Sequence, residues 1–474
     1  MLFCTQKFLF FFLVVFTVYW ALPWQRVRVV LLLIASYYFY ASWNPMLASL
    51  IFLTTTLDYA VARLMDASAS ERLRRALLTL SIGVNVGLLV YFKYANFFLA
   101  SLADCLNAAG MSASLPMLSV ILPVGISFYT FEAISYTVDV YRRRIPAERN
   151  LAHFLLFILF FPHLVAGPIV RASDFLPQVR RKKRWNWLRI ALGGKLVLLG
   201  LFKKLAIANR MALLVDPVFA NPTAYESSVL WMAAVGYAFQ VYCDFSGYSD
   251  LALGTAQLLG YRLAVNFNLP FAAANVTDFW RRWHISLSNW IRDYIFFPLG
   301  GSRSGRLRTA ANLLIAMTLC GLWHGANWPM VAWGTLNGLC MVVHRFFKEW
   351  AQRRPMLDRL LQTTAGIAVR IGLTFLTFVL TLVVFRTASL AAGMGMMERM
   401  FVSHSGLASP VPPISFWMIA TIIAAAHLLA AYPASWNLWE RLPSWAHGFG
   451  YAGLLIVSLI LAPANTPTFI YFQF

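Results

Sequence analysis

The chain alternates apolar runs with short polar or basic stretches along its whole length. A membrane-spanning helix needs about 20 predominantly apolar residues. Several runs are shorter and others contain polar residues, so we expect roughly 10–13 crossings together with re-entrant or tilted segments. The pattern predicts an all-α polytopic membrane protein, with one membrane-embedded domain over residues 1–474. The apolar runs are Phe8–Leu22, Val29–Trp43, Met46–Val61, Leu77–Tyr91, Tyr94–Leu106, Met117–Val140, Leu151–Val170, Trp187–Phe202, Val229–Tyr242, Leu251–Leu259, Leu313–Gly325, Val331–Phe347, Ile371–Phe385, Ile414–Leu429 and Tyr451–Ala462.

Composition agrees with this interpretation. Of the 474 residues, 60% are hydrophobic and 12% are charged, whereas soluble domains have about 45–50% and about 25%. These values exclude an ordinary soluble enzyme, a disordered protein and a nucleic-acid-binding protein. The five cysteines show no metal-ligand spacing, so neither a disulfide framework nor a metal site is expected.

The formal net charge of +21 is distributed in short clusters between apolar runs. The positive-inside rule predicts that most of these clusters face the cytoplasm and only set the topology. An alternative for a minority of them is binding the phosphates of a cytosolic donor. The clusters are Arg72–Arg75, Arg142–Arg144, Arg180–Arg184, Arg303–Arg308 and Arg345–Arg354.

Ionisable residues in apolar surroundings indicate function because burying them is costly. The first such stretch, Val276–Tyr294, has polar and apolar side chains at helical spacing. It predicts one amphipathic helix that lies at an interface or lines a wet cavity, with His284 on the polar side. The polar stripe contains Arg281, His284, Ser288 and Arg292, and the apolar stripe contains Trp280, Trp283, Leu287, Trp290 and Tyr294.

The second stretch, Leu313–Trp328, contains His324 with no charged residue within a helical turn. A neutral imidazole is the form that a general base needs, but a structural histidine bonded to a carbonyl fits equally well. Gly321 and Gly325 would let another backbone or an extended substrate approach His324. One turn on, Asn327 is a candidate hydrogen-bond donor to a thioester oxygen.

The third stretch, Gln240–Asp250, predicts a broken helix, because polar residues and Gly247 interrupt an apolar segment. We interpret Asp244 and Asp250 as structural residues that pair with Arg or His. No nucleophile elbow of the G-x-S-x-G kind occurs, which argues against a serine hydrolase. Residues 240–350 therefore form the expected catalytic core segment.

Taken together, these motifs resemble the membrane-bound O-acyltransferase (MBOAT) family. Within it the chain is similar to the bacterial branch that acetylates exported polysaccharides such as alginate or cellulose. The resemblance covers nearly the whole chain. It rests on Ser36–Tyr40, Tyr91–Tyr94, Leu122–Phe131, Phe161–Ile169, Asp278–Ser286, Gly321–Gly325 and Phe469–Phe474.

The resemblance implies a ring of helices in which the protein is thin at the centre of the ring. It also implies that His324 is catalytic and that an upstream Asn or His, here His284, is its partner. The implied donor is acetyl-CoA, with no tightly bound cofactor, and a cavity near His324 would join both membrane faces. Bulky tryptophans there would limit thioester hydrolysis. The further residues expected to bind substrate are Asn327, Trp323, Arg281, Trp283, Gly321 and Gly325.

The resemblance places the protein in the bacterial inner membrane, among membrane lipids. It implies a periplasmic SGNH-type acetyltransferase protein and an exopolysaccharide synthesis or export complex as partners, and no nucleic acid. A transporter or flippase of an acyl or sugar intermediate is the alternative function, although no inverted repeats are visible. A structural subunit of an export complex would explain neither histidine.

Overall fold

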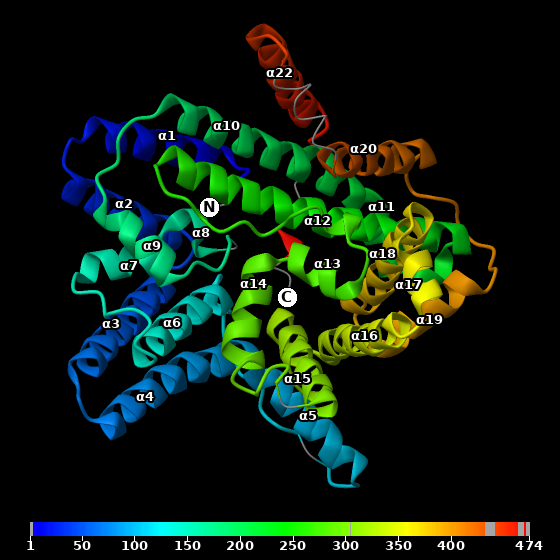
Figure 1. Ribbon diagram of the computed structural model, residues 1–474, viewed down its shortest axis with the longest axis horizontal. Coiled ribbons are helices and arrows are strands. Elements are labelled where there is room, and N and C mark those ends of the chain that lie inside the picture. The colour runs from blue at the N-terminus through cyan, green and yellow to red at the C-terminus, as the bar shows by residue number, and fades with distance from the viewer. Residues whose placement is uncertain are drawn as a thin grey trace. The chain divides into compact units, whose positions relative to one another are not determined.

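The computed structural model describes residues 3–112, 114–165, 167–303, 305–431, 441–462, 469 and 470. Their secondary structure is helical, apart from an isolated bridge between Tyr225 and Leu407 (Figure 1). The α-helices are α1 (Gln6–Ala21), α2 (Gln25–Ala41), α3 (Pro45–Ala67), α4 (Glu71–Leu89), α5 (Ala95–Ala108), α6 (Ile126–Tyr141), α7 (Leu151–Leu159), α8 (Phe161–Leu164), α9 (Ala172–Arg180), α10 (Trp187–Leu201), α11 (Asn209–Ala220), α12 (Ser227–Leu258), α13 (Val276–Arg282), α14 (Ile285–Ile291), α15 (Arg306–His324), α16 (Trp328–Gln352), α17 (Pro355–Gln362), α18 (Thr364–Arg386), α19 (Leu390–Phe401), α20 (Pro413–Ala431) and α22 (Ser444–Ile460). Three π-helical segments, η1 (Val90–Tyr94), η2 (Phe202–Ala208) and η5 (Arg292–Phe296), and two 3₁₀ turns, η3 (Pro222–Ala224) and η4 (Pro270–Ala272), complete them.

The chain divides into two compact units. The N-terminal unit contains Met1–Val197 and Leu251–Ala264, and the C-terminal unit contains Leu198–Asp250 and Val265–Phe474. The boundaries fall within α10 and within α12. The single membrane domain expected over residues 1–474 stays a prediction.

Within the described residues, four helical stretches are long and apolar enough to cross a membrane. They are Pro45–Ala67, Glu71–Ala108, Thr364–Arg386 and Pro413–Ala431. The all-α polytopic class predicted from the apolar runs is therefore confirmed, while the number of crossings stays a prediction. The runs Leu77–Tyr91 and Tyr94–Leu106, expected as separate segments, form one continuous helical stretch through the π-helical turn η1.

The N-terminal unit contains an α3–α4 hairpin against which α6 packs (Figure 1). Helix α3 begins where the Asn44 side chain accepts the backbone N–H of Leu47, with proline in the first turn. The buried carboxylate of Asp58 on α3 accepts hydrogen bonds from Ser81 and Asn85 on α4. These bonds satisfy a carboxylate that would otherwise be costly to bury.

The C-terminal unit is built around the α15–α16 hairpin, with α18 packed along α16. Its α12 runs unbroken from Ser227 to Leu258, so the broken helix predicted over Gln240–Asp250 is wrong. At Gly247 the end of α10 and the start of η2 pack directly on this helix. A Cβ atom at Gly247 would lie 2.9 Å from the carbonyl oxygen of Gly200. Separate apolar runs at Val229–Tyr242 and Leu251–Leu259 are thus parts of one helix.

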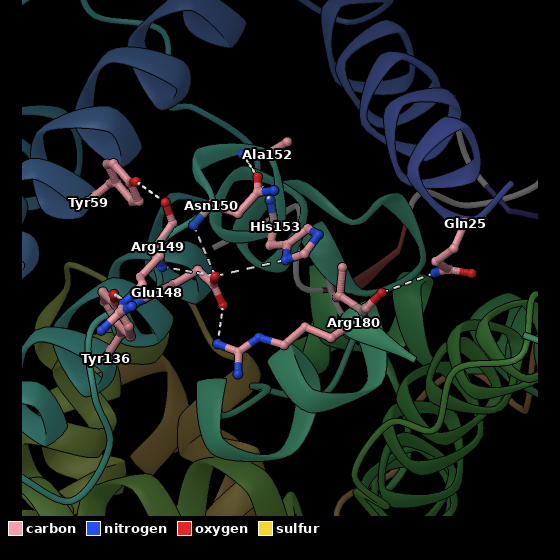
Figure 2. A network of polar contacts seen from close by, with 10 residues as sticks. Gln25, Tyr59, Tyr136, Glu148, Arg149, Asn150, Ala152, His153 and Arg180 are labelled. Atoms are coloured by element: carbon pink, nitrogen blue, oxygen red, sulfur yellow. Dashed lines mark hydrogen bonds and ion pairs between the residues drawn. The ribbon is translucent and has the colours of Figure 1, made fainter. Parts of the chain in front are cut away.

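A buried carboxylate secures the connection between α6 and α7 in the N-terminal unit (Figure 2). Glu148 accepts the backbone N–H groups of Arg149 and Asn150 and a guanidinium N–H of Arg180. The Tyr136 hydroxyl in turn accepts the backbone N–H of Glu148 at 2.9 Å. One side chain therefore ties the connection to α9.

We expect Glu148→Ala to destabilise the protein by about 2 kcal/mol or more, because it removes a charged acceptor from several donors at once. Glu71→Ala is the matched control. Its carboxylate also accepts a hydrogen bond, from Tyr141, but its side chain is mostly exposed. Thermal unfolding of both variants in detergent measures the effect, and equal midpoints for the two variants would contradict it.

Candidate functional site

His284 lies in a break between two short helices, α13 and α14, rather than on one amphipathic helix. Its φ of 42° is left-handed, and such a residue cannot continue an α-helix. The imidazole is fully buried, with its ring centroid 4.6 Å from that of Phe245. The single amphipathic helix with His284 on its polar face is therefore wrong, since the chain turns there and the ring is buried. The other members of the predicted polar stripe, Arg281, Ser288 and Arg292, do line a cavity, which is described below.

Asn266 holds this break in place. Its side-chain oxygen accepts both the backbone N–H and the hydroxyl of Ser286, at 3.3 and 2.6 Å. Its backbone carbonyl accepts the N–H of Ile285 at 2.9 Å. Asn266 is not predicted from the sequence, because an amide between Val265 and Phe267 belongs to no motif. Its importance follows only from the fold.

His324 ends α15 and is 4% exposed. Aromatic rings surround its imidazole, with centroids 4.9 Å away at Trp323, 5.1 Å at Trp333 and 5.6 Å at Phe385. The centroid of the His284 ring lies 6.4 Å from that of His324. The structure thus brings together the two histidines that the sequence singled out, although 40 positions separate them.

Glycine at position 321 serves helix packing. A Cβ atom there would lie 2.2 Å from the carbonyl oxygen of Met330 and 2.9 Å from the Cα of Gly334. The space beside Gly321 is thus filled by the backbone of α16, and the alternative of a substrate arm at this position is wrong. At Gly325 a Cβ would meet the Met330 side chain at 2.8 Å, so this position is also closely packed.

Asn327 caps a helix in this structure. Its side-chain oxygen accepts the backbone N–H of Met330 at 2.9 Å, which starts α16. The cap places the α15–α16 turn directly after His324. A hydrogen bond from Asn327 to a thioester stays a prediction.

The two aspartates on α12 pair with lysines. Lys204 contacts Asp244 at 2.5 Å, and Lys203 contacts Asp250 at 2.7 Å. Both lysines belong to the π-helical segment η2, so the expected Arg or His partners are wrong while the structural pairing is present. The other Asp244 oxygen accepts the backbone N–H of Ile470 at 2.8 Å.

Near the C-terminus, Phe469 and Ile470 pack on α12. The Phe469 ring stacks on Tyr248 at 4.4 Å and approaches Phe245, which itself contacts His284. The motif residues Tyr471–Phe474 lie outside the described residues.

A cavity of about 800 Å³ lies in the C-terminal unit between α13–α14, α15, α16 and α17. Cationic side chains contribute to its wall, namely Arg281, Arg292, Arg345, Lys348 and Arg370. Trp280 and Cys320 also line it, and both are buried. The carboxylates of Asp278 and Asp358 line it as well, and Arg292 and Arg345 form ion pairs with Asp293 and Glu349. Within the described ranges, Arg281 and Lys348 have no carboxylate within 4 Å, so these two side chains add positive charge to the wall without an ion pair.

The cavity wall lies close to His324. Cys320 precedes His324 by one helical turn on α15, and the Trp280 ring contacts Trp333, which contacts His324. Of the residues predicted to bind substrate, Arg281 lines this cavity; Trp283, Trp323, Gly321, Gly325 and Asn327 are not among its lining residues. His324 is not among them either, so a cavity that reaches it from both membrane faces stays a prediction.

Two imidazoles beside a cationic cavity suit proton transfer next to a phosphate-bearing ligand. Burial among aromatic rings disfavours an imidazolium ion, because charge is costly to place in such surroundings. A neutral imidazole can accept a proton from a hydroxyl. The same rings exclude water from the reacting groups.

Comparison with known proteins identifies the family of the chain. The model of the MBOAT, membrane-bound O-acyltransferase family matches residues 8–385. The chain therefore belongs to the MBOAT family and is a membrane-bound O-acyltransferase.

Several relatives are similar over much of the chain. A probable alginate O-acetylase, AlgI, of Pseudomonas aeruginosa is 41% identical over 405 residues, covering 85% of this chain and 75% of the relative. A peptidoglycan O-acetyltransferase of Helicobacter pylori is 38% identical, covering 67% and 64%. A teichoic acid D-alanyltransferase of Bacillus subtilis is 29% identical, covering 54% and 67%. An enzyme is therefore the correct class, rather than a transporter or a structural subunit.

We expect Asn266→Ala to lower acyl transfer at least tenfold, because a misplacement of about 1 Å near reacting groups can cost a hundredfold in rate. The control is Asn312→Ala, which also removes a buried amide, one that bonds to the Gly301 carbonyl away from His284. Activity is measured per folded protein, after size-exclusion chromatography. Equal loss in both variants would show that Asn266 contributes only to stability.

Proposed function

We propose that this enzyme transfers acetyl groups from cytosolic acetyl-CoA to hydroxyl groups of an exported polysaccharide of the alginate type. The observation that supports the proposal most directly is the cavity described above. Its wall contains Arg281 and Lys348, which form no ion pair within the described chain, and its buried part lies one helical turn from His324. The cationic and the buried parts of the cavity suit a ligand with phosphates at one end and a thin thioester arm at the other.

The donor phosphates would contact the cationic part of this wall. Arg281 and Lys348 are exposed there and have no carboxylate within 4 Å in the described chain. Guanidinium and ammonium groups form short, charge-assisted hydrogen bonds with phosphate oxygens. The thioester would extend toward Cys320 and Trp280, which are both buried.

His324 acts as the general base in this proposal. Its imidazole takes the proton of the acceptor hydroxyl while the hydroxyl oxygen attacks the thioester carbonyl carbon. The tetrahedral intermediate then collapses, the carbon–sulfur bond breaks, and the leaving CoA thiolate receives the proton from His324. His284 orients the groups or shares the proton, from a ring centroid 6.4 Å away.

The acceptor is inferred from the relatives. Those with the highest identity given above are named for O-acetylation of alginate or peptidoglycan, which are polymers outside the cytoplasm. An enzyme in the bacterial inner membrane would meet acetyl-CoA on one side and such a polymer on the other. We therefore propose a separate periplasmic SGNH-type acetyltransferase protein as a partner that receives the acetyl group or delivers it to the polymer.

Label transfer tests the whole proposal. Purified enzyme in nanodiscs is incubated with acetyl-labelled acetyl-CoA, with and without an alginate oligosaccharide and the periplasmic partner. We expect label on the oligosaccharide or the partner only when the enzyme is present. Transfer from another acyl-CoA but not from acetyl-CoA would overturn the choice of acyl group.

We expect His324→Ala to lower acetyl transfer by at least a hundredfold, within the range typical of general-base catalysis. His324→Gln keeps a polar side chain of similar size but cannot accept and release a proton, so it should be equally inactive. His427→Gln is the control, because His427 is also buried in the C-terminal unit but bonds to the Ile423 carbonyl. Near-normal transfer by His324→Gln would exclude the general-base role.

Substitution in the cavity wall should affect the donor rather than the chemical step. We expect the double variant R281Q/K348Q to raise KM for acetyl-CoA about tenfold with kcat little changed, because it removes two cationic contacts to phosphates. The matched control R353Q/R359Q removes two cations that do not line the cavity. An equal rise of KM in both variants would indicate a general charge effect.

A further inference from the structure

A second cationic cluster lies in the N-terminal unit, on the chain between α9 and α10. Arg180 at the end of α9 is neutralised by Glu148 (Figure 2). The next four residues, 181–184, are all basic, and within the described ranges none has a carboxylate within 4 Å. Arg181, Lys182 and Arg184 are exposed, whereas Lys183 is buried.

The backbone of this segment is held in place from both sides. Gln25 donates a hydrogen bond to the Val179 carbonyl and accepts one from the Lys183 N–H, at 3.0 and 3.3 Å. The Arg28 guanidinium donates to the Lys183 carbonyl at 2.9 Å. Asn186 then caps α10 by accepting the N–H of Arg189. The exposed cations are therefore presented on an ordered backbone.

Two of the cations in this cluster are buried without a carboxylate. Lys183 is 8% exposed, with its Nζ 4.2 Å from the centroid of the Tyr261 ring. Arg28 is 6% exposed and lies 5.0 Å from the ring centroids of Tyr19 and Trp20. Burial, together with the nearby Arg189 and Arg181, lowers the pKa of Lys183 to about 8. Several like charges thus share a small region that lacks a counter-ion from the described chain, and such a region favours a bound anion.

Tryptophans surround this cluster and indicate where the anion comes from. Trp185 packs edge-on against Trp20 and Trp187, at 5.1 Å between centroids in each case. Trp187 is 74% exposed, and Leu188 beside it is also exposed. Indole rings prefer the headgroup level of a bilayer. A soluble anion would meet the cations but would leave these apolar side chains in water.

We propose that the segment 181–188, together with Arg28, forms a binding site for the headgroup of an anionic phospholipid. The phosphate would lie between Lys183 and the exposed arginines, and the acyl chains would pass beside Trp187 and Leu188. This site lies in the other unit from the histidines, and the proposal does not depend on the acyl-transfer reaction. Its consequence is a preference for anionic over zwitterionic lipid at one defined position.

Native mass spectrometry of the purified full-length protein tests the proposal. The protein is released from mixed micelles that contain equal amounts of phosphatidylglycerol and phosphatidylcholine, and retained lipids are counted. The test variant is R181Q/R184Q, which changes two exposed side chains. The control is R72Q/R75Q, which removes two exposed cations from α4 in the same unit. A second variant, Lys183→Met, keeps the side-chain length but removes the buried charge.

We expect the wild type to retain phosphatidylglycerol selectively, and R181Q/R184Q to bind it about tenfold more weakly. Lys183→Met should weaken retention as well, while R72Q/R75Q should match the wild type. Equal retention in both double variants, or equal loss, would overturn the proposal. A parallel thermal-unfolding series adds phosphatidylglycerol, inorganic phosphate or CoA. Stabilisation by phosphate or CoA equal to that by phosphatidylglycerol would show that the site binds soluble anions.

Discussion

The backbone contact between α15 and α16 is the constraint on which the site depends. Gly321 and Gly334 approach so closely that a Cβ on either would overlap the other helix. Because the two helices touch there, the turn that begins directly after His324 is short, and Trp333 on α16 meets the imidazole edge-on. Close helix packing through small residues is thus what surrounds the proposed base with rings and keeps water away from it.

A second constraint comes from burying polar groups. Burying the Asp244 carboxylate in the middle of α12 would cost much free energy if it had no partner. It has two partners, the ammonium group of Lys204 and the backbone N–H of Ile470. The buried carboxylates of Asp58 and Glu148 in the N-terminal unit also have hydrogen-bond partners on other segments. Each buried carboxylate joins segments that are far apart in sequence. Charge burial therefore contributes to the specific arrangement of helices as well as to stability.

The sequence predicted the helical class and the two histidines, and the failures have clear physical causes. Periodicity describes one segment at a time, so it could not show that lysines on η2 neutralise α12 and let that helix run unbroken. It could not reveal Asn266 either, whose partners at Ser286 and Ile285 are set by tertiary structure. The spacing of Gly321 and Gly325 was compatible with either a backbone or a substrate beside Gly321. The structure shows that the neighbour is the backbone of α16. The cavity is lined by residues of α13, α14, η5, α15, α16, α17 and α18, and no local pattern indicates which cations face it.

The left-handed backbone at His284 restricts which residues can occupy that position. Most side chains avoid positive φ, whereas Asn and His are found there several times more often than others. The resemblance described above implies Asn or His at this place, and both residue types suit a left-handed backbone. The residue proposed as the partner of His324 therefore also meets a conformational requirement of the chain. In other MBOAT chains, a non-glycine residue at positive φ between two short helices would be a structural marker of this position, independent of sequence similarity.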